Sequence, residues 1–200
     1  MAVFNPRERT LECKIVYYGP GRGGKTTNLE QIFRTGKKYV TSDMVSVKTK
    51  GDRTLCFDFL PIGMGKVKGC DVKVQLYTVP GQAKYKSTRK LVLKNVDGVV
   101  FVADSLTARR KANKLALRDL QQNLAEIDLS IFRIPLVLQY NKRDLGARRI
   151  PIMPIEMMAK ELNGQLHAPA FEASAVTGAG VPATFKKCLS LTLNDLLKQL

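Results

Sequence analysis

The stretch GPGRGGKT at residues 19–26 decides how the rest of the chain is interpreted. It has the form G-x-x-x-x-G-K-[ST], and it stands between a β-branched, aromatic run at residues 14–18 and a helical pattern that begins at Lys25. Glycines in such a loop let several backbone N–H groups converge on one anion, and the following helix adds its positive N-terminal end. The pattern therefore predicts a phosphate-binding loop between a strand and a helix.

Two side chains of this loop are expected to act on a bound triphosphate. Lys25 would bridge the β- and γ-phosphates, and the Thr26 hydroxyl would ligate Mg²⁺. Arg22 either reaches a phosphate or is a solvated side chain, and both interpretations stay open. The other predicted contacts to the nucleotide in this loop are Gly19, Gly21, Gly23, Gly24 and Thr27. An ordinary glycine-rich turn is the alternative.

A second motif, NKRD at residues 141–144, identifies the base. Guanine presents two adjacent donors, N1–H and N2–H₂, so one carboxylate, that of Asp144, can accept both. Adenine presents an acceptor at N1, and such a buried polar mismatch discriminates by orders of magnitude. Asn141 is expected at the other edge of the base, where it also ties down the phosphate loop, with the stem of Lys142 along the ring.

A third contact to the base is expected after the last predicted strand. Ser174 and Ala175 would put a backbone N–H near guanine O6. Each short motif is weak alone, but the three follow the order that one guanine-nucleotide site requires.

Strand-like and helix-like segments alternate along the chain. The predicted strands are residues 13–18, 54–60, 71–79, 97–103, 135–140 and 170–173, and the predicted helices are 25–33, 84–93, 106–127, 155–162 and 182–198. This order predicts an α/β fold: a P-loop, doubly wound, mostly parallel six-stranded sheet with helices on both faces. Because no helix joins the second and third strands, we expect them to form an antiparallel hairpin at the sheet edge. No linker or repeat divides the chain, so residues 1–200 are predicted to form a single domain.

The composition is that of a globular but strongly basic protein. With 44% hydrophobic residues, the 200-residue chain can bury one sizeable core, while 33 Lys+Arg against 17 Asp+Glu give a net charge of +16. Residues 84–118 carry ten basic and two acidic side chains, half of that net charge. This basic window is predicted to dock an acidic partner or an anionic membrane, with a merely solvated face as the alternative. Nucleic acid is an unlikely ligand, because stacking aromatics do not interleave with the basic residues.

The sequence contains no readable membrane or secretion signal. Its longest apolar runs have the length of a strand, and the N-terminus lacks an apolar core followed by a cleavage site. We therefore expect a cytoplasmic protein, with recruitment to a cell pole or to the inner membrane surface left open.

These motifs resemble those of the Ras-like small GTPases, and more closely those of the bacterial MglA family, which governs gliding motility and cell polarity. The resemblance rests on KIVYYGPG (14–21), RTL (53–55), FDFLP (57–61), YTVPGQ (77–82) and QYNKRD (139–144). Ordinary Ras-like proteins carry Asp-x-x-Gly where this chain has Thr78 to Gly81, so the Mg²⁺ site lacks one carboxylate. Asp58 is the candidate to replace it, because it alternates in phase with Thr54. An edge hydrogen bond by Asp58 is the alternative.

The resemblance implies a GTP-binding and GTP-hydrolysing switch with GTP or GDP and Mg²⁺ as cofactors. Gln82, next to Gly81, would orient the attacking water, and Thr54 would contact Mg²⁺. Arg53 would act as an arginine finger supplied in cis, or would be an ordinary surface arginine.

The same resemblance implies slow intrinsic turnover, a roadblock-fold activator dimer of the MglB type, and effectors that bind the GTP state. A scaffold that binds guanine nucleotide without hydrolysing it is the alternative, because of Thr78. A P-loop kinase or ATPase is opposed by Asn141 and Asp144.

Overall fold

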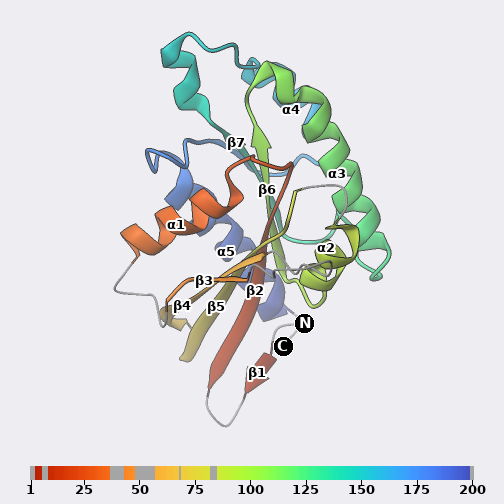
Figure 1. Cartoon of the computed structure of the whole chain (residues 1–200). Helices are drawn as coiled ribbons and strands as arrows, with labels where there is room; N and C mark the ends of the chain where they lie inside the picture. Colours follow the sequence, from red (N-terminus) through yellow and green to blue (C-terminus); the bar gives the residue numbers. More distant parts are fainter. Residues whose placement is uncertain are drawn as a thin grey trace.

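The computed structural model describes residues 3–5, 9–36, 43–47, 57–67, 69–81 and 85–198. These residues form one eight-stranded sheet with the order β3-β4-β5-β2-β6-β7-β8, and β1 pairs with β2 (Figure 1). The strands are β1 (Val3–Asn5), β2 (Thr10–Tyr18), β3 (Val45–Val47), β4 (Phe57–Val67), β5 (Cys70–Thr78), β6 (Gly98–Asp104), β7 (Leu136–Asn141) and β8 (Ala170–Glu172). The helices are α1 (Lys25–Thr35), α2 (Lys86–Leu93), α3 (Arg110–Ala125), α4 (Ile155–Leu162) and α5 (Val181–Lys198), with 3₁₀ segments η3 (Thr107–Arg109) and η4 (Arg143–Arg148).

The predicted fold class is confirmed. All six predicted strands are present, although residues 54–56 of the second lie outside the described residues; β5, β2, β6, β7 and β8 run parallel, and β4 pairs antiparallel with β5. Two short strands, β1 and β3, were not predicted, because three residues carry too little pattern to be read.

The hairpin differs from its prediction in two ways. β4 runs on to Val67 instead of ending at Leu60, with a register shift between Gly63 and Lys66. Pro61 and the glycines after it suggested a loop, yet an outer strand tolerates proline and a bulge. In addition, β3 pairs with the first residues of β4, so β4 is not the outermost strand over that stretch.

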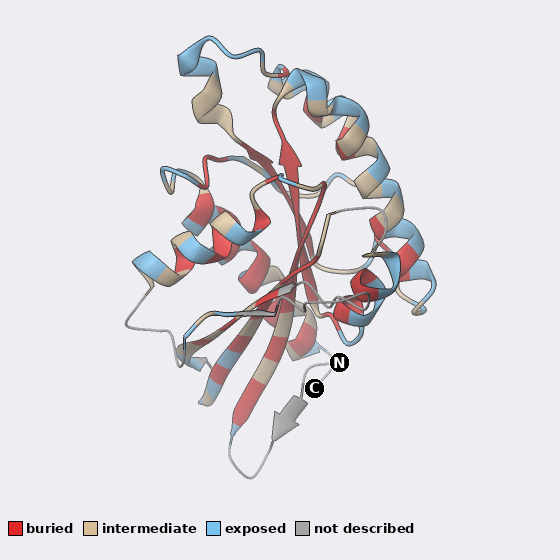
Figure 2. Cartoon of the chain, in the orientation of Figure 1, coloured by how far each residue is buried: buried red, intermediate tan, exposed pale blue. Residues whose placement is uncertain are grey.

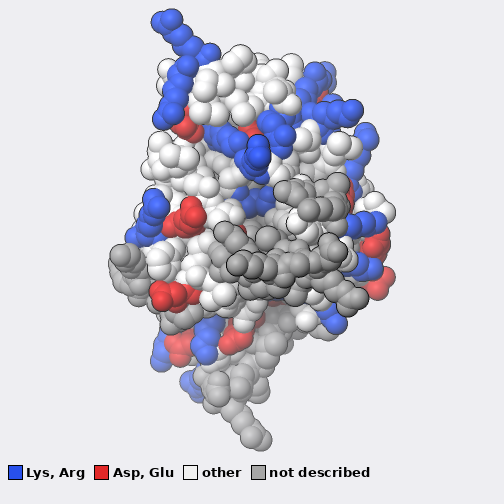
Figure 3. Space-filling model, in the orientation of Figure 1, with Lys and Arg blue, Asp and Glu red and all other residues white. Residues whose placement is uncertain are grey.

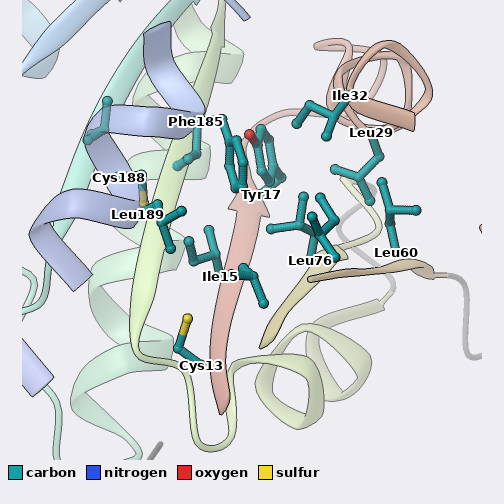
Figure 4. Packing of buried hydrophobic residues seen from close by; sticks show 14 of the residues in the cluster. Cys13, Ile15, Tyr17, Leu29, Ile32, Leu60, Leu76, Phe185, Cys188 and Leu189 are labelled. Atoms are coloured by element: carbon teal, nitrogen blue, oxygen red, sulfur yellow. The ribbon is translucent and has the colours of Figure 1, made fainter. Parts of the chain in front are cut away.

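The sheet is covered on both faces, as Figures 1 and 2 show. One buried cluster joins the sheet to α1 and α5, and Figure 4 shows Leu29 and Ile32 of α1 facing Leu60 and Leu76. The other joins it to α2, α3 and α4. β6 and β7 are buried along their whole length and begin with apolar runs, as expected of strands that are covered on both faces. None of the described helices combines the length and the apolar character needed to cross a membrane.

This topology gathers five loops at one edge of the sheet. β2, β5, β6, β7 and β8 run parallel, so the segments that follow them emerge at their common carboxyl end. Ligands of open α/β sheets bind at this edge. The phosphate-loop motif, NKRD and Ser174-Ala175 all follow these strands.

Candidate active site

The phosphate loop has the backbone shape that its glycines predict. Gly19 and Gly24 have positive φ angles of 137° and 98°, and a Cβ on Gly19 would lie only 2.2 Å from the carbonyl oxygen of Val102. Residue 19 must therefore be glycine. Arg22 also lies in the left-handed region, with φ 61°, and the Gly23 N–H donates to the Pro20 carbonyl at 3.2 Å. The loop turns tightly into the first residue of α1, Lys25.

The Lys25 side chain is folded back over this loop. Its Nζ donates to the Gly19 carbonyl at 3.0 Å and to the Pro20 carbonyl at 2.8 Å, and the residue is only 6% exposed. Burial, together with the positive charge of Arg89 and against the opposing effect of Asp58, lowers the pKa of Lys25 to about 8. A bound phosphate would favour the charged form of this ammonium group and raise its pKa.

Asp58 lies where β4, β5 and α1 meet. Its Oδ2 accepts hydrogen bonds from the Thr26 hydroxyl at 2.5 Å and from the Thr78 hydroxyl at 2.8 Å, and its backbone N–H donates to Thr78 Oγ1 at 2.9 Å. β4, the strand next to Thr78, thus brings a carboxylate into hydrogen-bond contact with the Thr26 and Thr78 hydroxyls. One carboxylate and two hydroxyls form a hard oxygen set, which fits Mg²⁺ when phosphates and waters complete the coordination.

The NKRD motif is hydrogen-bonded to the phosphate loop through Asn141. Asn141, 1% exposed, donates from Nδ2 to the Gly23 carbonyl at 2.8 Å and accepts the Ala175 N–H at Oδ1 at 2.9 Å. One side chain therefore links three of the loops at the sheet edge. Ser174 is buried beside it, and Asp144 lies one turn further on, in η4.

The segment after β5 rests against the phosphate loop. A Cβ on Gly81 would lie 2.2 Å from the nitrogen and 2.4 Å from the Cα of Gly21, so only glycine permits this approach. Gln82 follows directly, but Gln82, Arg53 and Thr54 lie outside the described residues, and so does Lys84 of the basic window. The roles given to Gln82, Arg53 and Thr54 stay predictions.

A cavity of about 1100 Å³ opens over the phosphate loop and Asp58, whereas the predicted base contacts Asn141, Asp144 and Ser174 do not line it. Thr27, Asp58, Thr78 and Gly81 line it together with the phosphate loop, and it extends to Arg109 and to Leu115 of α3. Figure 3 shows Lys and Arg atoms gathered in the hollow above the grey segment. This region has the shape and sign of charge that a polyphosphate requires.

An ion pair that sequence reasoning missed lines this cavity on the side of α3. Arg89, 5% exposed, places Nε 2.7 Å from Asp119 Oδ2, and its Nη1 donates to the Pro80 carbonyl at 3.4 Å. Tyr18 donates its hydroxyl to the same carboxylate, and burial together with this hydrogen bond raises the Tyr18 pKa. The segment leading to Gly81 is thereby tied to α3. In the sequence, Arg89 looked like one more member of the basic window.

Several cations of the basic window form ion pairs with carboxylates, which the sequence did not predict. Lys86 and Lys90 pair with Glu126, and Arg110 and Lys114 pair with Glu161, whose pKa falls to about 2 mainly through its hydrogen bond from Arg110. In Figure 3, red atoms accompany the blue ones at the right-hand edge, where α2 and α3 lie in Figure 1. Glu126 and Glu161 thus offset part of the charge that the sequence assigned to a docking face.

Comparison with known proteins agrees with this geometry. The model of the Ras family matches residues 14–194. The chain belongs to the Ras family. It is 46% identical over 198 residues to the mutual gliding-motility protein MglA of Myxococcus xanthus, covering 99% of both chains. It is also 31% identical over 144 residues to the Ras-related protein Rab-4 of Dictyostelium discoideum, covering 70% of this chain and 64% of that protein.

Membership of the Ras family fixes the reaction. The chain is a small GTPase of the MglA-like kind, which binds GTP and GDP and hydrolyses GTP. Like other members of its family, it works as a switch with regulators and effectors. Neither comparison favours a scaffold that does not hydrolyse GTP.

Proposed function

We propose that this chain is a Mg²⁺-dependent GTPase switch that controls gliding motility or cell polarity. The observation that carries the proposal is the meeting, at one edge of the sheet, of the phosphate loop, the Asp58–Thr26–Thr78 cluster and the Asn141 bridge. The link to motility comes from the likeness to the gliding-motility protein of Myxococcus xanthus. Recruitment to a cell pole is part of the same proposal.

Different groups of the site would bind the phosphates, the Mg²⁺ ion and the base. The backbone N–H groups of the loop and the N-terminus of α1 would hold the phosphates, and Lys25 would turn from the Gly19 and Pro20 carbonyls toward them. Thr26, Asp58 and Thr54 would hold Mg²⁺, which neutralises negative charge on the phosphates when bound. Asp144 would accept both guanine donors.

Hydrolysis would depend on the segments beside the phosphate loop. Gln82 would orient the attacking water, because it follows the glycine that rests on Gly21. Arg53 would supply positive charge to the oxygen atoms that gain negative charge in the transition state. We further propose that a roadblock-fold dimer of the MglB type stimulates turnover by ordering these groups of the chain itself.

Base selectivity tests the site most simply. The parent chain should bind GDP at least about a hundredfold more tightly than ADP, since Asp144 would pair with two guanine donors and face an acceptor in adenine. Asp144→Asn should remove most of that difference, whereas Asp128→Asn, at a left-handed turn after α3, should keep it. Equal affinities for GDP and ADP in the parent would refute the assignment of the base.

A narrower docking surface remains on α3. Lys111 and Arg118 are exposed and have no carboxylate partner among the described residues, and Leu115, 54% exposed, lies between them and lines the cavity. We propose that an acidic protein partner docks there, beside Gly81. Lys111→Glu with Arg118→Glu should weaken capture of the GTP-loaded chain by its activator at low salt and spare intrinsic hydrolysis. Unchanged capture, or loss of binding to anionic vesicles alone, would contradict a protein partner.

A further inference from the structure

A buried carboxylate lies between the two halves of the site. Asp104 ends β6 and is 0% exposed, and its Oδ2 lies 2.6 Å from Lys142 Nζ and 3.7 Å from Arg109 Nε. Its Oδ1 accepts the Leu106 N–H at 3.1 Å. Lys142 belongs to the guanine motif, whereas Arg109 belongs to the 3₁₀ segment η3 before α3. One carboxylate thus contacts a cation of the NKRD motif and a cation of the segment before α3.

A buried side chain of α3 holds the backbone of Asp104 in place. Asn113 of α3, 1% exposed, accepts the Asp104 N–H at Oδ1 at 2.9 Å and donates from Nδ2 to the Asp104 carbonyl at 2.8 Å. Both backbone polar groups of Asp104 are therefore occupied by one rigid side chain. The carboxylate is presented to the two cations in a set orientation.

Arg109 reaches from this carboxylate to the phosphate loop. Its Nη2 donates to the Gly21 carbonyl at 2.6 Å, and the side chain lines the cavity. In a trans peptide the C=O and the following N–H point in opposite directions. Holding the Gly21 carbonyl on the Arg109 side therefore turns the Arg22 N–H the other way. Arg22 is not glycine yet lies at φ 61°, a conformation that costs energy and needs such outside support.

We propose that Asp104 and Arg109 are positioning residues of the nucleotide site. Asp104 holds Lys142 at the base and Arg109 at the phosphate loop, and Arg109 turns the Gly21–Arg22 peptide so that its N–H serves the β-phosphate. The proposal rests on the phosphate loop binding the phosphates of a guanine nucleotide. It adds a link between the phosphate and base halves that is separate from the Asn141 bridge.

Comparing GDP with GMP separates the two roles, because GMP lacks the β-phosphate. Affinities are measured by displacement of fluorescent GDP in the presence of Mg²⁺. Arg109→Gln should weaken GDP binding about tenfold, as expected for loss of a charged hydrogen bond at a partly exposed side chain, and leave GMP within about twofold. Asp104→Asn should weaken both nucleotides about tenfold. Arg110→Gln, whose parent side chain pairs with Glu161, should change neither.

Three results would overturn the inference. They are unchanged GDP affinity in Arg109→Gln, an equal loss of GDP and GMP in that variant, and unchanged GMP affinity in Asp104→Asn. If Asp104→Asn does not fold, Lys142→Gln removes the same ion pair from the cation side and should weaken GMP and GDP alike; a loss confined to GDP would contradict the link. Failure of the parent chain to bind GDP would instead refute the proposed function.

Discussion

Replacing Gly81 with alanine is expected to slow GTP hydrolysis far more than it weakens GDP binding. The new Cβ would lie 2.2 Å from Gly21 N, 2.4 Å from Gly21 Cα and 2.6 Å from the carbonyl carbon of Pro20. All three are backbone atoms, so no side-chain rotation relieves the overlap, and the segment must move by about 1 Å to restore ordinary contacts. A displacement of this size at a catalytic group costs about a hundredfold in rate.

The effect should be concentrated in the catalytic step, because Gln82 is the next residue while the base contacts lie elsewhere. We therefore expect single-turnover hydrolysis about a hundredfold slower in Gly81→Ala, with GDP affinity within about threefold of the parent. Gly65→Ala is the matched control: its φ is +74°, so alanine is strained there, but no atom lies within 4 Å of the added Cβ. Hydrolysis at the parent rate in Gly81→Ala, or an equal loss in Gly65→Ala, would refute the reasoning.

Three further predictions concern the charged and catalytic groups. The pKa of Lys25 is about 8 without nucleotide and rises beside phosphate, so GDP affinity should fall between pH 8 and 9, with proton uptake on binding. For the same reason the nucleotide-free protein should gain stability from about pH 8 to 10.5. Calorimetry in two buffers checks the first expectation and thermal melts the second, and a flat pH profile would contradict them. Asp58→Asn should raise the Mg²⁺ concentration needed for tight GDP binding about tenfold, and an unchanged Mg²⁺ titration would exclude Asp58 from the metal site. Gln82→Leu and Arg53→Ala should retain GTP yet hydrolyse it more slowly, Arg53→Ala most visibly with the activator; turnover at the parent rate in both would remove their catalytic assignment.

Much of the fold could be predicted because the local patterns agree with the topology. The apolar runs that became β6 and β7 are buried on both faces, so they stand out in the sequence. The GPGRGGKT loop requires glycine at residues 19 and 24 for reasons of backbone geometry alone. Such features need no knowledge of distant contacts. β3 was not predicted, because its pairing with β4 is set by the partner strand and not by its own three residues.

The site was only partly predictable, because charge does not reveal its partner. Arg89 and Arg109 were counted as surface cations. In the structure, Arg89 is buried against Asp119, and Arg109 donates a hydrogen bond to the Gly21 carbonyl. Asp104 gave no signal beyond ending an apolar strand. Period-2 alternation did suggest that Asp58 faces the site, and its contacts with Thr26 and Thr78 agree with that orientation. Partners that lie far away in the sequence become visible only once the sheet is assembled.

The most direct test of the central claim is turnover of GTP and ATP, side by side, by the purified chain with Mg²⁺. We expect slow conversion of GTP to GDP and phosphate, acceleration by a roadblock-type activator, and no turnover of ATP above background. Because Asp144 and Asn141 would define the base and the phosphate loop would bind any triphosphate, selectivity and hydrolysis must appear together. Hydrolysis of ATP at the GTP rate, or GTP that stays intact with the activator present, would contradict the account.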